Sequence, residues 1–190
     1  MDLNNKTVLF LGSSVTHGSA AGDISFADIM ADICPLHSIK ETVPGTALAD
    51  VNSESYVARL KRLDTNLKPD LFICQLSTND ASSSLNIELS KTEDAIRFII
   101  EYVKETFSCP IVFYTGTYFE NEKYADMVKL LYSLQKEYDF YILDLYNDKE
   151  MLNVSKEDYN KYMADPIHPT LIGYKEWWTP KFIDFCKNLL

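Results

Sequence analysis

Short apolar runs rich in β-branched residues alternate along this chain with longer stretches in which apolar residues recur at helical spacing. This alternation is typical of a parallel sheet covered by helices on both faces. Three of the runs, TVLFL, LFICQ and IVFYT, are almost continuously apolar, as expected of strands buried on both faces. The expected strands are Thr7–Leu11, Leu36–Glu41, Leu71–Gln75, Ile111–Thr115 and Tyr141–Leu145.

Helical periodicity marks the segments between and after these strands. One helix has a clear start, because Ser90 and Glu93 have the spacing of a capping box, and Pro110 marks its end. The aromatic residues near the carboxyl end of the chain, Trp177 among them, are expected to pack in the core. The expected helices are Phe26–Ile33, Ser53–Leu63, Thr92–Phe107, Tyr124–Tyr138 and Thr170–Leu189.

Five strands joined by right-handed crossovers predict an α/β fold, a flavodoxin-like three-layer α/β/α sandwich around a five-stranded parallel sheet. A chain of 190 residues fits one domain, residues 1–190, which buries roughly 70% of the surface of the unfolded chain. Ligands of such sheets bind where the carboxyl ends of the strands meet their loops. The segments of interest are therefore Gly12–Ser19, Thr42–Asp50, Leu76–Ser84, Gly116–Lys123 and Tyr146–His168.

The formal net charge of −10 argues against nucleic acid as a partner, because a nucleic-acid binder concentrates Lys and Arg to neutralise phosphates. No stretch has the apolar length of a transmembrane segment, and the first residues do not resemble a signal peptide, so we expect a cytoplasmic protein. The sequence does not indicate an oligomeric state. Four cysteines lie far apart beside apolar segments, and we expect them to be free thiols in the core: Cys34, Cys74, Cys109 and Cys186.

The first strand runs directly into Gly12, Ser13 and Ser14. A serine at such a strand end can expose its hydroxyl while neighbouring backbone N–H groups face the same pocket, which are the two requirements of acyl-transfer catalysis. Taken alone, the same pattern also fits a serine-rich helix cap.

Two further loops contain uncharged hydrogen-bond donors suited to an oxyanion. Gly45 follows the second strand and offers a backbone N–H, and Asn79 follows the third strand and offers a side-chain amide. Each is also a routine turn residue, so neither is specific on its own. Asp80 is expected to hold its loop by accepting backbone N–H bonds.

Asp165 and His168 lie three residues apart in a loop stiffened by prolines, just ahead of the last helix. This spacing allows the carboxylate to meet imidazole Nδ1 and leaves Nε2 free to take a proton from serine. Because the chain has only three histidines, a histidine in this setting is a stronger indication of catalysis. His17, in the turn after Ser14, fits a surface position better than a substrate contact.

Together these four segments, in this order, resemble the SGNH (GDSL-type) hydrolase superfamily, whose namesake residues are a serine, a glycine, an asparagine and a histidine. The resemblance implies a serine esterase or acylhydrolase that needs no metal or organic cofactor and cleaves a small-molecule ester. It implies that Ser14, His168 and Asp165 are catalytic, and that the oxyanion hole consists of the Ser14 N–H, Gly45 and Asn79.

The chain departs from the family pattern at two positions. Ser13 stands where the family's Gly-Asp-Ser motif has aspartate, and Ser77 stands where its Gly-x-Asn-Asp motif has glycine. Neither departure removes a group with a direct catalytic role.

Two other functions compete with this interpretation. A hydroxyl-rich loop after the first strand also fits a flavodoxin-like protein that binds flavin or a nucleotide, although that leaves Asp165 and His168 unexplained. The chain also fits a hydrolase scaffold that has lost activity and serves as a binding module. A P-loop is excluded because no Gly-Lys-Ser/Thr follows Gly18, and the α/β-hydrolase fold is disfavoured because Ser14 lacks the G-x-S-x-G motif.

The sequence leaves the substrate open among acetylated carbohydrates, short-chain lipid esters and thioesters. Tyr118 and Phe119 are able to stack on a sugar ring, to line an acyl pocket or to pack in the core. We expect specificity to be set by the loops Gly116–Lys123 and Tyr146–Ala164.

Overall fold

A five-stranded parallel sheet forms the centre of the molecule in a computed structural model that describes residues 3–189. The strand order is β2-β1-β3-β4-β5, which is the flavodoxin-like order, so the predicted fold class is confirmed. Every strand starts within one residue of its predicted position. The strands are β1 (Thr7–Gly12), β2 (His37–Thr42), β3 (Leu71–Gln75), β4 (Ile111–Tyr114) and β5 (Tyr141–Leu143).

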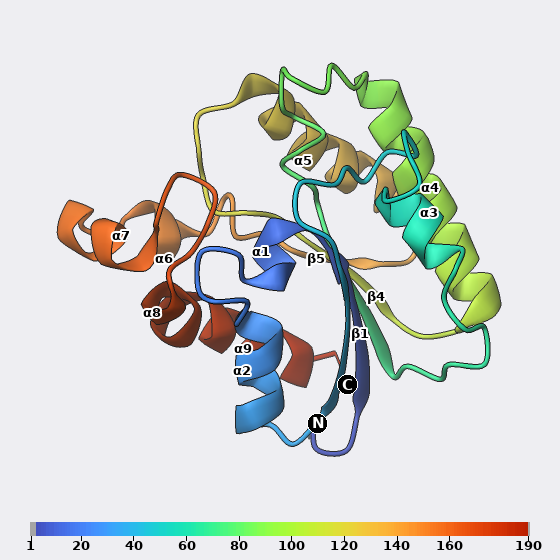
Figure 1. The fold of residues 1–190 in the computed structure, drawn as a ribbon, viewed down its shortest axis with the longest axis horizontal. Coiled ribbons are helices and arrows are strands. Elements are labelled where there is room, and N and C mark those ends of the chain that lie inside the picture. Colours follow the sequence, from blue (N-terminus) through green and yellow to red (C-terminus); the bar gives the residue numbers. More distant parts are fainter. Residues whose placement is uncertain (1–2, 190) are drawn as a thin grey trace.

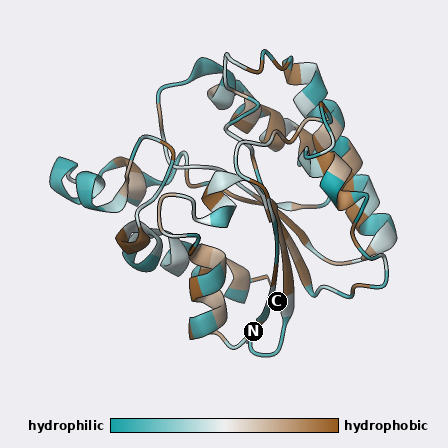
Figure 2. Ribbon diagram, in the orientation of Figure 1, coloured by the Kyte–Doolittle hydropathy of each residue, from teal (hydrophilic) through white to brown (hydrophobic). Residues whose placement is uncertain are grey.

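Helices cover both faces of the sheet (Figure 1). Because side chains alternate along a strand, Leu9 and Leu11 of β1 enter one core cluster while Val8 and Phe10 enter the other. The first cluster contains residues of α3 (Tyr56–Leu60), α4 (Leu89–Thr106) and α5 (Glu122–Leu134), and the second contains residues of α2 (Phe26–Ile33) and α9 (Thr179–Lys187). Figure 2 shows apolar strands at the centre and polar outer helix faces.

The last helical segment is not the continuous α-helix predicted for Thr170–Leu189. It consists of α8 (Leu171–Gly173), a π-helical turn η1 (Tyr174–Trp178) and α9. Pro180 lies in the first turn of α9 and has no N–H for a bond to the preceding turn, which favours the wider turn just before it.

Other helix boundaries differ from the predictions. The capping box predicted at Ser90 and Glu93 is wrong, because α4 begins at Leu89 after Glu88 and has no side-chain cap. Leu89 packs against the core, and this tertiary contact extends the helix past Ser90. The helix predicted for Ser53–Leu63 is observed only as α3. The helix predicted for Tyr124–Tyr138 is α5, which ends at Leu134.

Three short helices lie in segments expected to be loops. They are α1 (Ser14–His17), α6 (Lys149–Leu152) and α7 (Lys156–Tyr162). Apolar periodicity does not predict these helices, because each spans two turns or less and α7 buries none of its residues. All three belong to loops at the carboxyl ends of β1 and β5, where the candidate site lies.

Within residues 3–189, no helix is both long and apolar enough to cross a bilayer. The four cysteines are free thiols, of which Cys109 is half-buried and the others are buried. Both core clusters include residues of the same sheet. That residues 1–190 form a single domain stays a prediction, which one cooperative unfolding transition would support.

Candidate active site

The turn between β1 and α1 exposes Ser14 and buries Ser13. A side chain at Gly12 would collide with Thr16, so glycine is required where the strand turns into the helix. The buried side-chain amide oxygen Oε1 of Gln75 accepts hydrogen bonds from Ser13 N at 3.0 Å and from Thr16 Oγ1 at 2.8 Å. Ser14 is half-buried, whereas the exposed fraction of Ser13 is 0%. Only Ser14 therefore offers its hydroxyl to the outside of this turn.

His168 lies against that hydroxyl. Its Nε2 atom is 2.8 Å from Ser14 Oγ, and its Nδ1 atom is 2.7 Å from Asp165 Oδ2. The other oxygen of Asp165 accepts the N–H groups of Ile167 at 2.7 Å and His168 at 2.8 Å. The serine, the imidazole and the carboxylate thus form one continuous series of hydrogen bonds.

The same bonds act on the acidity of Asp165. Partial burial raises the pKa of this carboxyl, but the hydrogen bonds from Ile167 N–H and from His168 outweigh burial and hold the pKa below its ordinary value. Asp165 therefore stays ionised opposite the imidazole.

Contacts on both sides fix the loop that carries His168. Ala164 N donates to the His168 carbonyl at 2.8 Å, and Met163 and Pro169 form an antiparallel bridge. Behind the loop, the buried Tyr174 hydroxyl donates to Val15 O at 2.6 Å and joins η1 to α1. The histidine loop and the serine turn are therefore held to each other by the fold.

Two backbone N–H groups, one after β1 and one after β2, donate no hydrogen bond within residues 3–189. Gly45 lies in the exposed loop after β2 with φ of 77°, a left-handed conformation that favours glycine. Among residues 3–189, the N–H groups of Ser14 and Gly45 have no hydrogen-bond acceptor. Both remain available to a ligand oxygen.

Asn79 also lies at this turn, but its side-chain amide has partners. Nδ2 donates to Ser13 Oγ at 3.2 Å and to Thr46 O at 3.0 Å. Its backbone N donates to Ser77 Oγ at 3.2 Å, and Ser77 Oγ in turn donates to Thr46 O at 3.2 Å. The amide of Asn79 is thus held between the loops that follow β1 and β2.

Asp80 accepts backbone N–H bonds, as predicted, but from the loop after β2 rather than from its own loop after β3. Its carboxylate accepts Leu48 N at 2.7 Å, Ala49 N at 2.9 Å and Thr92 Oγ1 at 3.1 Å. Burial raises the pKa of Asp80 above its ordinary value although these hydrogen bonds oppose the shift. The contacts are structural, because this carboxylate is fully enclosed.

A hollow of about 550 Å³ opens beside His168. Its walls come from the loop after β3, the loop after β4 and the histidine loop: Thr78, Ser82, Ser83, Phe119, Glu120, Asn121, Asp165, Pro166, Ile167 and His168. His17 is not one of these residues. It contacts Thr42 Oγ1 at 3.1 Å and Asp23 at 3.0 Å, which is a half-buried surface position.

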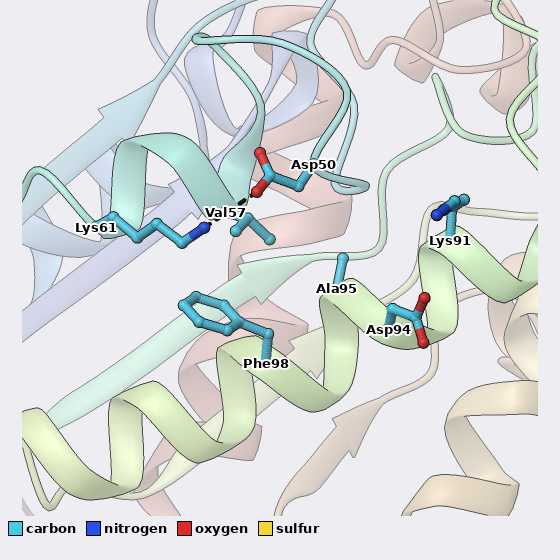
Figure 3. A pocket seen from close by; sticks show the side chains of 7 residues that line it. All are labelled: Asp50, Val57, Lys61, Lys91, Asp94, Ala95 and Phe98. Atoms are coloured by element: carbon cyan, nitrogen blue, oxygen red, sulfur yellow. Dashed lines mark hydrogen bonds and ion pairs between the residues drawn. The ribbon is translucent and has the colours of Figure 1, made fainter.

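A separate hollow of about 230 Å³ lies between α3 and α4 (Figure 3). It contains the pair Lys61–Asp50, with a distance of 3.1 Å, and the Lys61 ammonium lies 4.8 Å from the centre of the Phe98 ring. None of Ser14, Asp165 and His168 lines it. This hollow is therefore separate from the contacts among Ser14, His168 and Asp165.

Comparison with known proteins agrees with this geometry. The model of the GDSL-like lipase/acylhydrolase family matches residues 10–176. The chain belongs to this family. Family membership makes it an ester-bond hydrolase. No match was found among curated proteins.

Solved structures of similar fold include proteins named as esterases or acylhydrolases, at low sequence identity. A lipase/acylhydrolase from Enterococcus faecalis is 18% identical with a TM-score of 0.73, and the match covers 97% of each chain. An aryl esterase from M. smegmatis is 16% identical with a TM-score of 0.75, covering 97% of this chain and 100% of the other. A carbohydrate acetylesterase family member from Sinorhizobium meliloti is 15% identical with a TM-score of 0.72, covering 97% and 99%.

In this GDSL-family hydrolase, the two serines that depart from the family motifs both contact Asn79. Ser13 Oγ accepts its side-chain amide, and Ser77 Oγ accepts its backbone N–H. The hydroxyls therefore take part in fixing Asn79, which the sequence alone did not indicate.

Sequence reasoning also missed Arg59. This residue of α3 is 1% exposed, and its guanidinium donates to Gly12 O at 2.8 Å, to Glu41 O at 2.8 Å and to Thr46 Oγ1 at 3.3 Å. It thus joins the ends of β1 and β2 to the loop of Gly45. An arginine within an apolar helical stretch, YVARL, is the only signal in the sequence that points to it.

Proposed function

We propose that this GDSL-family hydrolase is a serine esterase in which Ser14 is the nucleophile, His168 the general base and Asp165 the residue that orients the base. The observation that carries the proposal is the pair of distances 2.8 Å from Ser14 Oγ to His168 Nε2 and 2.7 Å from His168 Nδ1 to Asp165 Oδ2. An ionised carboxylate on Nδ1 fixes the tautomer in which Nε2 accepts a proton.

The first half-reaction begins when Ser14 Oγ attacks the ester carbonyl while its proton moves to His168 Nε2. The carbonyl π electrons move to the oxygen, and the resulting tetrahedral intermediate collapses by breaking the bond to the alcohol. The alcohol leaves with the proton from the imidazolium, and an acyl-enzyme remains on Ser14. Water then attacks the acyl group and gives a proton to the same imidazole. The bond to Ser14 Oγ breaks, the imidazolium returns the proton to that oxygen, and the acid leaves.

The negative oxygen of the intermediate is assigned to three donors. The N–H groups of Ser14 and Gly45 are free to meet it. The amide of Asn79 is bound to Ser13 Oγ and Thr46 O in the resting enzyme, so it must release or share one of these acceptors when the charge forms. Such a change favours the transition state over the ground state, because an anionic oxygen accepts a stronger hydrogen bond than a hydroxyl does.

For the substrate we propose an ester of a short acyl group, with an acetylated carbohydrate as the favoured class. The hollow beside His168 supports this, because the hydroxyl side chains of Thr78, Ser82 and Ser83 interrupt its apolar lining of Phe119, Pro166 and Ile167. Hydroxyl groups bond to sugar hydroxyls, whereas a long acyl chain favours a continuous apolar lining. One structural neighbour is named a carbohydrate acetylesterase family member.

The test is hydrolysis of p-nitrophenyl acetate by the wild-type chain and by Ser14→Ala. We expect the substitution to reduce kcat by at least about 10³-fold, because the nucleophile of a triad acts as a unit with its base. Ser19→Ala, at an exposed serine five residues away, is the matched control and should retain wild-type activity. A Ser14→Ala protein with full activity would overturn the assignment.

An inactive wild-type chain would support the alternative of a binding module on a hydrolase scaffold. Flavin absorbance or nucleotide binding by the purified protein would support a flavodoxin-like function instead. In either case the triad assignment would fail.

We also propose that the protein works in the cytoplasm. Its four cysteines are free thiols, as is usual in a reducing compartment. Detection of the native protein in an extracellular or membrane fraction would contradict this location.

A further inference from the structure

A hollow of about 300 Å³, termed the second hollow, is lined by residues that follow β4 and β5, as is the hollow beside His168. It lies between the loop that follows β4 and the segment that contains α6, α7 and η1. Apart from Trp177 of η1, its lining comes from Gly116–Lys123 and Tyr146–Ala164, the two loops in which we expect specificity to be set. Neither Ser14 nor His168 lines this hollow, so it is distinct from the place where the ester bond is proposed to break.

Residues adjacent in the sequence line the two hollows. Tyr118 lines the second hollow and the adjacent Phe119 lines the hollow beside His168. On the other side, Tyr159 belongs to α7, which ends at Tyr162, three residues before Asp165. The charge of Asp165 even contributes to raising the pKa of Tyr159, after the larger effect of burial. A molecule with its reacting carbonyl at Ser14 therefore has this second hollow as its neighbouring surface.

Three aromatic residues line the second hollow together with three aliphatic ones, Met151, Leu152 and Val154. Tyr118 has an exposed fraction of 51%, and Tyr159 and Trp177 are half-buried beside it. Trp177 is fixed by stacking on Tyr162, with ring centres 5.4 Å apart and planes at 24°. Such partly exposed, held rings are suited to contact with a flat or ring-shaped ligand.

Two polar groups at the same hollow lack partners. The Thr117 hydroxyl is buried and has no hydrogen-bond partner within the described part of the chain. Lys156 lines the hollow and is exposed, and among residues 3–189 its ammonium forms no ion pair. A buried hydroxyl without a partner is unfavourable, so a ligand that supplies a partner gains free energy.

We propose that this second hollow is a subsite for a sugar ring in the alcohol part of the ester. The C–H faces of a sugar ring pack on aromatic side chains, and its hydroxyls pair with groups such as Thr117 and Lys156. An alkyl chain would leave both polar groups without partners. The inference rests on the proposed esterase function for its role in catalysis, but binding of a sugar here is testable without turnover.

The binding test uses Ser14→Ala protein and tryptophan fluorescence. The chain has two tryptophans, of which Trp177 lines the hollow and Trp178 is fully buried, so contact with a ligand acts mainly on Trp177. The probes are xylobiose, cellobiose, mannobiose and N,N'-diacetylchitobiose, with sodium hexanoate as the alkyl-chain probe. We expect a saturable change with at least one disaccharide and none with hexanoate.

Two substitutions then locate the bound sugar. Tyr118→Ala and Lys156→Ala, each made in the Ser14→Ala protein, should raise the Kd about two- to tenfold, as expected for one ring contact or one hydrogen bond. Tyr141→Ala is the matched control, because Tyr141 is an exposed tyrosine at the amino end of β5 and does not line the hollow. Absence of any disaccharide response, a response unaffected by both substitutions, or a response to hexanoate alone would overturn the proposal.

A kinetic comparison separates the subsite from the proposed function. The ratio of kcat/KM for the acetylated form of the bound disaccharide to kcat/KM for ethyl acetate should fall in Tyr118→Ala and in Lys156→Ala, and stay unchanged in Tyr141→Ala. Sugar binding without hydrolysis of either ester would overturn the esterase function and leave the subsite. Hydrolysis with an unchanged ratio would overturn the subsite and leave the esterase function.

Discussion

The guanidinium of Arg59 donates a hydrogen bond of 2.8 Å to the carbonyl oxygen of Gly12, the last residue of β1 before the turn that exposes Ser14. The same group bonds to Glu41 O at the end of β2 and to Thr46 beside Gly45. An almost fully buried cation thus holds the carbonyl groups from which the serine turn and the Gly45 loop begin.

Arg59→Met should therefore lower both stability and turnover. Removal of a buried, bonded charge leaves several carbonyl oxygens without donors, and we expect unfolding to become easier by about 3 kcal/mol. Among molecules that stay folded, kcat should fall while KM changes little. The reason is that Arg59 supports the turns that carry the proposed oxyanion donors and does not line the hollow beside His168. Thermal unfolding and p-nitrophenyl acetate kinetics measure the two effects.

Two further variants test whether the guanidinium of Arg59 and its buried position cause these effects. Arg59→Lys keeps the charge but not the planar fork, so it should recover part of the stability and of kcat. Arg62→Met is the matched control, since Arg62 is half-exposed and its contact with Glu54 is 3.5 Å, and it should change stability by no more than about 0.5 kcal/mol. Equal effects at both arginines would contradict the role given to Arg59.

Asn79→Ala should leave the chain folded and lower kcat by about 10²–10³-fold, the usual effect of removing one oxyanion donor. The loss of its bonds to Ser13 and Thr46 should reduce stability by only about 1 kcal/mol. Steady-state kinetics with p-nitrophenyl acetate give the result, and Asn66→Ala at an exposed asparagine is the control. Activity of Asn79→Ala within twofold of wild type would remove Asn79 from the oxyanion hole.

Ser77→Gly restores the glycine of the family motif, yet it should reduce kcat several-fold here. The substitution deletes the hydroxyl that accepts Asn79 N and donates to Thr46 O, which are both at 3.2 Å. It also adds backbone freedom at this position, so stability should fall by about 1 kcal/mol. The kinetics and the melting temperature of the variant are the measurements, and higher activity than wild type would show that the hydroxyl has no positioning role.

Asp70 gives a pH dependence of stability with a definite sign. The N–H of Thr7 and the Lys6 ammonium, each 2.9 Å away, hold the pKa of Asp70 below its ordinary value of 3.8. A carboxyl with a lowered pKa in the folded state stabilises the fold above its ordinary pKa, and that contribution is lost as the pH falls through the folded-state pKa.

Asp70→Asn should therefore lower the melting temperature at pH 7, and the difference from wild type should shrink as the pH falls below 3.8. Because the Lys6–Asp70 pair is about one-third exposed, the effect at pH 7 should be no more than about 1 kcal/mol. Glu157→Gln, at an exposed residue of α7, is the control. A difference in melting temperature between wild type and Asp70→Asn that grows toward low pH would contradict this prediction.

The strands and the motif residues at their ends could be predicted because both signals are local. A continuous apolar run such as LFICQ marks a buried strand, and a parallel sheet brings the ends of its strands to one edge. This placed Ser14, Gly45, Asn79 and the Asp165–His168 loop together although they are far apart in the sequence. The structure shows the contacts among Ser14, His168 and Asp165, and their catalytic roles stay proposals.

The supporting contacts could not be predicted because they depend on tertiary packing. Arg59 was one charged residue in a helical segment, and only the fold shows that it reaches Gly12 O. Gln75 was the polar end of a strand, and its side-chain Oε1 accepts the N–H of Ser13. The helix α7 has no buried residues, so its sequence lacks the apolar face by which a helix is recognised.

The central claim is that Ser14 is the nucleophile, and covalent labelling with a fluorophosphonate followed by peptide mass spectrometry tests it most directly. The reagent phosphonylates a serine only when a neighbouring base activates the hydroxyl. The account predicts one label per chain on Ser14, and no label after His168→Ala. A label on Ser13, or an unlabelled Ser14 in a chain that still hydrolyses p-nitrophenyl acetate, would contradict it.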